Sequence, residues 1–461
     1  MIPDPPPPRV ERALTAGWRT ATLRGGVAFL AMVALGQLVA FAAFAARGAH
    51  GSETTYAKLG WLYFAMFHHV GVEFRAPDLA FGQPGSFGAS GIVPSGGSLE
   101  FRIGIALLLT TAAGGWLLFL AGRATATRAG GGPIARALHG MKVAPAYAIP
   151  SLVVSLLVSI RAEIPRNEIV NGALEVKAVA AQAFLYPLLL ALVAGAAGGL
   201  WSAREEPSAR EPRARRVAGV LAGGVRMFVL GLVLSFVGLL ALAVAEPDAT
   251  KAYFEGVSSR GPADAAVLIG NHVLLLPNQS MWVLVPAMGG CDGAYEAGRS
   301  YPVLCYWKYP RSVSVSPLGV ATGQPGAARF GFAPPGYWLF LLVPAVSVLL
   351  GGKAAASRAG ARSRSEASVL GAAAGVVFAV LVLAGAGLSS VSFGVSTTLR
   401  GLPGGGSGRV GPDIVAGGLL ALAWGVVGGW IGGLLHAREL PPPPPPPAPP
   451  LPPAEGESRT S

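Results

Sequence analysis

Long apolar stretches separated by short polar segments run through most of the chain. Eight of them approach the length of about 20 residues that an α-helix needs to cross a bilayer. The pattern predicts an all-α polytopic membrane protein with about eight transmembrane helices. The predicted spans are Val27–Ala46, Ile103–Gly122, Ala146–Ile160, Ala178–Trp201, Val217–Ala245, Gly336–Gly352, Ala367–Ser389 and Ile414–His436.

Two further apolar segments do not read as simple crossings. The stretch Asp264–Gly290 is interrupted by "LLPNQS", where Pro277 predicts a break in the helix. We expect a re-entrant hairpin here, with an interfacial helix as the alternative. For the aromatic segment Gly60–Phe74, "GWLYFAMFHHVGVEF", we expect the reverse: an interfacial helix, with re-entry as the alternative.

The distribution of positive charge predicts the orientation of the spans. With eight crossings, the inside segments 1–26, 123–145, 202–216 and 353–366 carry seventeen Lys or Arg in 78 residues. The outside segments 47–102, 161–177, 246–335 and 390–413 carry fifteen in 187 residues. A ninth crossing would place "KAAASRAGARSR" outside. We therefore expect both termini in the cytoplasm and the first span uncleaved.

The spans divide the chain into two similar halves. A cytoplasmic segment, 1–26, precedes a first four-helix half, 27–201. The basic linker 202–216 leads to a second four-helix half, 217–436, which includes the long outside loop 246–335. The tail 437–461 is Pro-rich and predicted to be disordered; its polyproline II run could also bind an aromatic groove.

A tetrapeptide recurs at matching places in the two halves. "GQPG" stands at 82–85 and at 323–326, each time in a polar loop after one span and an outside apolar segment, and before three more spans. The order of elements indicates a 4+4 parallel repeat. Accidental recurrence in a chain with 65 Gly and 39 Pro is the alternative.

Composition supports the membrane prediction and excludes two other classes. Hydrophobic residues make up 52% of the chain and charged residues 13%, too few for the surface of a water-soluble protein of this length. The net charge of +12 could suggest nucleic acid, but the basic residues lie in clusters between apolar runs. The expected partner is therefore the lipid bilayer, and no nucleic acid.

Polar residues near membrane depth are the candidates for a pocket or pathway. They gather in the two outside segments, and the Pro277–Asn278 break is the sharpest pointer among them. The candidate residues are Asn271, His272, Pro277, Asn278, Gln279, His68, His69 and Glu73. His68, His69 and Glu73 could also be metal ligands, but adjacent histidines project about 100° apart on a helix, so we expect no metal and no cofactor.

Cysteines and glycines carry two structural predictions. Cys291 and Cys305, the only cysteines, lie in one outside loop, where we expect a disulfide; free thiols are the alternative. In the last span Gly425, Gly429 and Gly433 are spaced by four, which lets helices approach closely. We expect packing within the monomer, with a dimer seam as the alternative.

The chain shows no catalytic signature, so we expect no enzyme. It resembles the actinobacterial integral-membrane family of the cell-division protein PerM, a domain of unknown function. The resemblance rests on size, on about eight spans, on "LLLPNQSMWVLVPAMGG", and on "LPGGGSGRVGPDIVAGG" running into "GVVGGWIGGLL" and a Pro-rich tail. It implies a non-enzymatic protein of a bacterial plasma membrane that supports cell division or envelope assembly by contacts with division or envelope membrane proteins.

Two other functions compete with this scaffold. A transporter, facilitator or lipid flippase would use segment 264–290 as part of its route, although the scarcity of buried charge disfavours ion coupling. A channel would need a ring of pore-lining charges, which the sequence does not suggest. The oligomeric state does not follow from the sequence.

Overall fold

The computed structural model describes residues 16–46, 53–81, 95–164, 170–203, 212–245, 262–296, 299–310, 330–399 and 402–439. Both copies of GQPG and the Pro-rich run at 441–453 lie outside the described residues.

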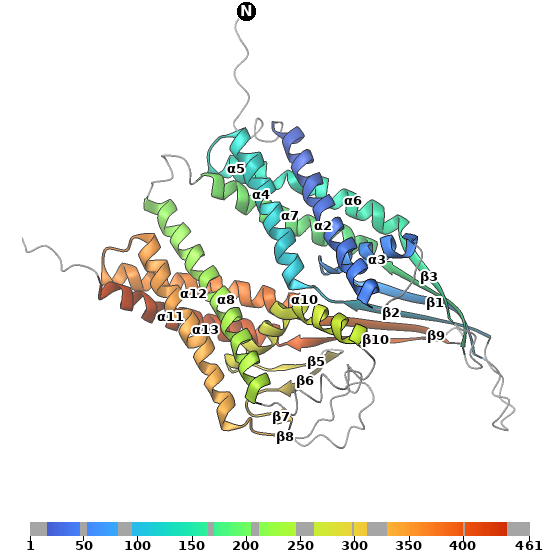
Figure 1. Ribbon diagram of the computed structural model, residues 1–461. Coiled ribbons are helices and arrows are strands. Elements are labelled where there is room, and N and C mark those ends of the chain that lie inside the picture. Colours follow the sequence, from blue (N-terminus) through green and yellow to red (C-terminus); the bar gives the residue numbers. More distant parts are fainter. Residues whose placement is uncertain are drawn as a thin grey trace, which may run out of the picture.

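The described part of the chain is mostly helical, as predicted. The helices form an elongated bundle in which the two halves lie next to each other (Figure 1). The bundle helices are α2 (Trp18–Ala46), α4 (Leu108–Ala129), α5 (Pro133–Met141), α6 (Val143–Leu157), α7 (Ala180–Ser202), α8 (Pro212–Ala245), α11 (Leu342–Ala359), α12 (Arg364–Ser389) and α13 (Ile414–Ala437). Helices α3 (Glu53–Met66) and α10 (Pro262–Ala287) and the 3₁₀ helix η3 (Pro335–Leu341) complete the set.

Seven helical segments among the described residues are long and apolar enough to cross a membrane. They fall on seven of the eight predicted spans; the helix of the predicted span Ile103–Gly122, α4, is not among them. Large apolar side chains point away from the protein, such as Leu30, Val193 and Leu419, which are 64%, 70% and 64% exposed. Exposed apolar surface on this scale is typical of lipid contact. The helices are compatible with a multi-pass membrane protein.

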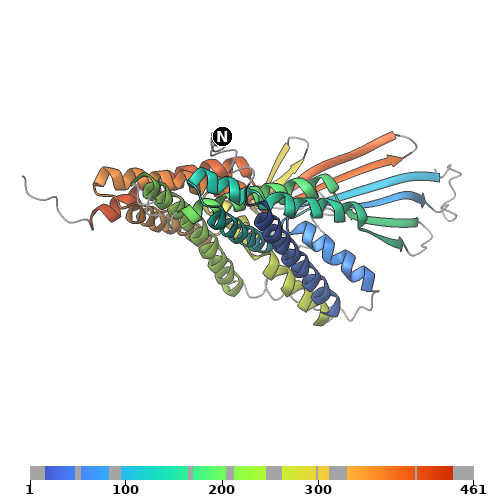
Figure 2. The same ribbon diagram turned by 90° about the horizontal axis from the view of Figure 1, so that it is seen from above.

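The all-α prediction is wrong in one respect, because an antiparallel sheet stands at one end of the bundle (Figure 2). Its eight strands run in the order β3-β4-β1-β2-β9-β10-β5-β6. The strands are β1 (Val72–Phe81), β2 (Ser95–Gly104), β3 (Ser159–Ile164), β4 (Val170–Ala178), β5 (Asp292–Glu296), β6 (Arg299–Leu304), β9 (Val391–Leu399) and β10 (Leu402–Pro412). A separate short pair consists of β7 (Tyr309–Pro310) and β8 (Phe330–Gly331).

Alternation of apolar and charged residues explains why these segments are strands. On one face, Phe74 lies opposite Phe101 in β2 and Val176 in β4. This apolar face packs against α3 and the start of α7. On the other face, Arg75 lies opposite Glu100 and Glu175. One side of the sheet is therefore buried against helices and the other carries cross-strand charge pairs.

The predicted break at Pro277 is also wrong. Helix α10 is continuous from Pro262 to Ala287, with Pro277 and Pro286 inside it. A proline removes one backbone hydrogen bond, and here the packing of α10 against α8, α12, α4 and α2 keeps the helix intact. The interfacial helix expected over Gly60–Phe74 is helical only to Met66, because the chain turns after α3 and enters β1 at Val72.

The elements occur in the same order in both halves of the sequence. Each half has two helices, a hairpin, two bundle helices, a second hairpin and a final helix. The second bundle helix is α5 together with α6 in the first half and α12 in the second, and β7, β8 and η3 are added in the second half. The strand order within the sheet is also the same, because β3-β4-β1-β2 is followed by β9-β10-β5-β6. The halves meet where β2 pairs with β9.

Candidate functional site

His68 is buried between α3 and α6 rather than exposed to a pathway. Its Nδ1 donates to the Phe64 carbonyl oxygen at 2.7 Å, because a carbonyl can only accept. Its Nε2 then accepts a hydrogen bond from the Tyr147 hydroxyl at 2.7 Å. Burial lowers the pKa of His68 to about 4, so the imidazole is neutral near pH 7. The structure gives His68 a packing role that joins two helices.

His69 lies next to His68 but serves a different element. Its ring lies 5.9 Å from that of Tyr186 in α7. Its φ of 62° places it in the left-handed region, where the chain reverses out of α3. The two histidines therefore point to different neighbours, as their adjacency on the chain suggests.

Glu73 belongs to a network of charges on the polar face of the sheet. Its carboxylate, 5% exposed, forms ion pairs with Arg102 and, at 3.1 Å, with Arg75. Glu100 extends the network, at 3.4 Å from Arg75 and 3.6 Å from Arg102. Among the residues that the structure describes, no three His, Cys, Asp or Glu side chains come close enough to hold a metal ion. The carboxylate of Glu73 is used to hold β1 and β2 together.

Asn278 joins the two halves of the molecule. It lies in α10 and is 4% exposed. Its Nδ2 donates to the Ala106 carbonyl oxygen at 2.6 Å, and its Oδ1 accepts from the Leu108 amide at 3.0 Å. These are the backbone groups at the start of α4, in the other half of the chain. The amide thus satisfies an open helix end, which is costly to leave unpaired in a dry environment.

The remaining candidates on α10 lie near Asn278 without forming a shared site with it. Gln279 Nε2 is 2.5 Å from His272 Nδ1. Because Gln279 directly follows Asn278 on α10, its side chain projects about 100° away from the Asn278 side chain that contacts α4. Pro277 is within the helix, half-buried. Asn271 lies in the same helix, and its side chain is outside the described residues. The structure brings together the two pairs Asn278–α4 and Gln279–His272, and it places His68, His69 and Glu73 elsewhere.

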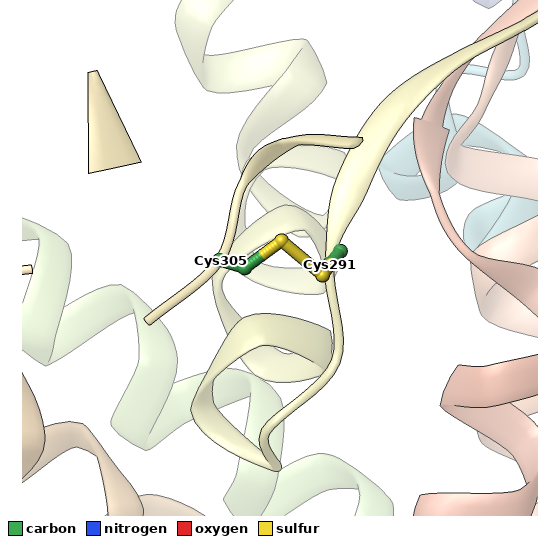
Figure 3. The surroundings of a disulfide bond; sticks show 2 residues. All are labelled: Cys291 and Cys305. Atoms are coloured by element: carbon green, nitrogen blue, oxygen red, sulfur yellow. A yellow bond between two sulfur atoms is a disulfide. The ribbon is translucent and has the colours of Figure 1, made fainter. Parts of the chain in front are cut away.

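The two cysteines form a disulfide at the base of the β5–β6 hairpin, which lies at one edge of the sheet. Cys291 directly precedes β5 and Cys305 directly follows β6, with Cα atoms 4.6 Å apart (Figure 3). The bridge fixes the ends of both strands at the point where they leave the helix bundle. It therefore stabilises the edge hairpin of the sheet.

The glycines of the last span pack against other helices of the same chain. A Cβ on Gly429 would be 2.3 Å from the Gly371 carbonyl oxygen in α12, and one on Gly433 would be 2.2 Å from the Ala367 carbonyl oxygen. Gly425 makes the same close approach to Gly375. Only glycine permits backbones to come this close.

A buried carboxyl group that the sequence reasoning missed lies at the start of β5. Asp292 is 6% exposed, and neither carboxylate oxygen has a hydrogen-bond partner. Burial raises the pKa of this carboxyl group well above its usual range. The sequence offers one signal for it, an acidic residue directly after Cys291. In the corresponding strand β1 the first residue is the apolar Val72.

An apolar groove runs between α11 and α13 on the outside of the bundle. It has a volume of about 370 Å³ and is lined by residues that include Val348, Leu349, Trp424, Val427 and Ile431. Such a surface suits the acyl chains that composition predicts around these helices. It contains none of the polar candidates named above.

The comparisons with known proteins give no relative. No family model matches the chain, and no curated protein and no solved structure is similar to it.

Proposed function

We propose that the chain is built from a duplicated unit and acts as a membrane scaffold whose sheet provides docking surfaces. It is supported by matching contacts in the two halves, by the common side on which the strands of the large sheet lie, by the structural use of the polar candidates, and by the free edges of that sheet.

Helix packing in the first half supports the duplication. Gly195 of α7 lies between two glycines of neighbouring helices. A Cβ on Gly122 would be 2.6 Å from the Gly195 Cα, and one on Gly140 would be 2.1 Å from the Gly195 carbonyl oxygen.

The second half has the same contacts in the same order. Gly429 of α13 lies between Gly352 and Gly371. A Cβ on Gly352 would be 2.7 Å from the Gly429 Cα, and one on Gly371 would be 2.1 Å from the Gly429 carbonyl oxygen. Two unrelated four-helix units would not be expected to share glycines, partners and distances.

The turns that lead into the sheet also match. The Val70 amide donates to the Ala65 carbonyl oxygen at 3.1 Å, and 220 positions later the Gly290 amide donates to the Val285 carbonyl oxygen at 3.0 Å. The residue before each donor has a positive φ: 62° at His69 and 97° at Gly289. These correspondences support a 4+4 parallel repeat, in which α4 takes the place of α11.

The positions of the strands support eight crossings. Two of the four hairpins of the eight-stranded sheet, β5–β6 and β9–β10, lie within segments that positive charge predicts to be outside, and the other two lie on such segments with β2, β3 and β4 extending one or two residues beyond them. Hairpins on one side of a membrane require an even number of crossings between them. The pairs α4–α6, α7–α8 and α11–α12 would provide it if α4 crosses as an eighth helix beside the seven apolar ones. We therefore propose a bacterial plasma-membrane protein with cytoplasmic termini and an exoplasmic sheet.

The observation that carries the scaffold proposal is the sheet itself. Among the described strands, β3 and β6 each have a neighbour on one side only. Free strand edges present unpaired backbone donors and acceptors and are a common site of protein binding. By contrast, Asn278, Gln279, His68 and Glu73 are engaged within the chain, which leaves transport through α10 with less support.

The test combines depletion with capture from the producing cell. A scaffold of the kind implied by the PerM resemblance predicts elongated or misshapen cells on depletion, and co-purification of division or envelope proteins with a tagged chain. The opposing result is normal cell shape together with solute or lipid movement catalysed by the purified chain in proteoliposomes. That result would replace the scaffold by the transporter.

A further inference from the structure

The joint between the halves is a continuous piece of sheet. Strand β2 of the first half pairs antiparallel with β9 of the second, from Gly97 opposite Leu399 to Gly104 opposite Ser392. Helix α10 spans the same boundary by packing against α4 and α2. The joint is heterologous, since it brings together two different edges of the four-stranded unit.

Among the described strands, the two free edges of the sheet, β6 and β3, correspond to the two edges that meet at the joint. Within its unit, β6 takes the place of β2, because each is the second strand of the first hairpin and lies at the end of the strand order. Strand β3 takes the place of β9 for the corresponding reason. At one end of the sheet, β6 therefore presents the kind of edge that β9 pairs with at the joint. At the other end, β3 presents the kind of edge that β2 pairs with.

We infer that a second copy of this chain is the docking partner, with β3 of one copy pairing antiparallel with β6 of the next. This inference rests on the proposed duplication and scaffold role, and it names the partner of that scaffold. It continues an interface that the chain already contains, so it requires no new kind of contact.

The register of the joint specifies which residues should meet. Tyr301 lies opposite Ala294, the third residue of β5, as Phe101 lies opposite Phe74, the third residue of β1. Phe101 is opposite Val395 across the joint.

On the other edge, Ile164 takes the position of Val395. It pairs with Gly172, six residues before the end of β4, and Val395 pairs with Gly406, six residues before the end of β10. We therefore expect Tyr301 opposite Ile164 between copies.

The edge strands limit the strength of this contact. Each has six residues, against ten in β2 and nine in β9. Arg161 in β3 and Pro302 in β6 are residue types that oppose indiscriminate strand pairing. At the same time Tyr301 and Val303 leave 47% and 43% of their surfaces exposed. A short, selective pairing fits a reversible assembly.

The membrane restricts the form of the assembly. The joint within one chain keeps both halves in one bilayer with the same orientation. The symmetry operation that relates the two halves is therefore a rotation about an axis along the membrane normal. Repeating that operation between copies leaves every copy in the same bilayer and arranges them as an arc or a closed ring. A face-to-face dimer with two-fold symmetry would use like edges and is a different arrangement.

The test uses paired cysteine variants in one membrane. The chain has no free cysteine, so introduced thiols react alone. Tyr301→Cys and Ile164→Cys copies, with different affinity tags, are co-expressed and treated with a short bis-maleimide. We expect a cross-link between the two tags, and none when either variant is present alone. Leu99→Cys, an exposed position inside the sheet, replaces Tyr301→Cys as the matched control and should give none.

Two results would overturn the inference. Cross-links within the Tyr301→Cys population alone would mean that like edges meet. A cross-link yield no higher than that of the Leu99→Cys control, together with a single-copy mass for the wild-type chain extracted in native nanodiscs, would mean that copies do not associate. Capture of other envelope proteins by such a single-copy chain would leave the proposed scaffold standing, so the two failures are distinguishable.

Discussion

Single polar side chains hold the two halves and the sheet in place. Asn278 links α10 to the start of α4, His68 links the end of α3 to Tyr147 in α6, and Glu73 links β1 to β2. Each of the three is itself buried and bonds to a partner on another element. Loss of Asn278 or His68 should lower stability because a buried partner is left without a hydrogen bond, and loss of Glu73 because Arg102 loses its carboxylate partner.

Replacing Asn278 gives the clearest measurement of this kind. Asn278→Ala should lower the free energy of unfolding by about 1–3 kcal/mol, because the Ala106 carbonyl and the Leu108 amide remain buried without partners. Gln279→Ala, which leaves those two groups paired, is the control and should cost less. Equal effects in detergent-based unfolding would contradict the bridging role.

The carboxyl group of Asp292 predicts a pH dependence. Because burial raises its pKa in the folded state, the folded chain holds this proton more tightly than the unfolded chain. The contribution is fully favourable below the unfolded pKa near 4 and is lost as pH rises through the folded pKa. Asp292→Asn should therefore match wild type in unfolding experiments near pH 4 and exceed it near pH 8. Parallel pH profiles of the two proteins would contradict this prediction.

At the scale of elements, glycine contacts determine how closely the helices pack. In both halves the final helix, α7 or α13, is held by backbone approaches that a methyl group would block. Aliphatic residues between these contacts remain free to face lipid. The helices therefore combine close internal seams with an apolar exterior.

Gly429→Ala tests the seam. The added Cβ would stand 2.3 Å from the Gly371 carbonyl oxygen, so α13 and α12 must separate, at an expected cost of about 1–3 kcal/mol. Gly26→Ala is the matched control, since nothing lies within 4 Å of its Cβ. It should be neutral or gain up to about 1 kcal/mol from helix propensity. Similar melting temperatures for both variants would rule out a close seam at Gly429.

The sequence predicted the helices better than the strands, for physical reasons. Runs such as Ile414–His436 are uniformly apolar and long, and only a helix satisfies their backbone in lipid. The strands are shorter, and β10 contains "GGGSG", which has no alternation to detect. Alternation is present in "SLEFRIG" and "SIRAEI", but these segments lie where predicted spans meet outside segments, and the length of the apolar runs decides the prediction there. The break predicted at Pro277 is wrong because the packing of α10 against neighbouring helices outweighs the tendency of proline to interrupt a helix.

At the scale of the whole molecule, one bundle supports one sheet. Every pairing within the sheet is between segments brought to the same end of the bundle, and the central pairing joins strands nearly 300 residues apart in the sequence, as between Gly104 and Ser392. Such long-range pairing does not follow from local sequence pattern. The contacts of the candidate site residues cannot be predicted for the same reason. Asn278 is a predicted pocket candidate, but its partners on α4 become apparent only when both halves are assembled.

Thiol labelling tests the orientation of the whole molecule. Ser300→Cys in β6 should react with a membrane-impermeant maleimide in intact cells, because the sheet is proposed to be exoplasmic. Ser365→Cys at the start of α12 should react only after permeabilisation. Both positions are exposed in the folded chain, so access depends on the membrane side alone. The opposite pattern would invert the topology.

The disulfide has a consequence for biogenesis. Covalent closure of the β5–β6 hairpin needs an oxidising compartment, and in the proposed topology Cys291 and Cys305 reach one only after insertion. In that topology the β5–β6 hairpin, which carries the edge strand β6, is closed only after its loop has crossed the membrane. Until the bridge forms, the hairpin that provides the edge strand is not covalently closed. Association between copies would then depend on export of this loop rather than on synthesis of the chain.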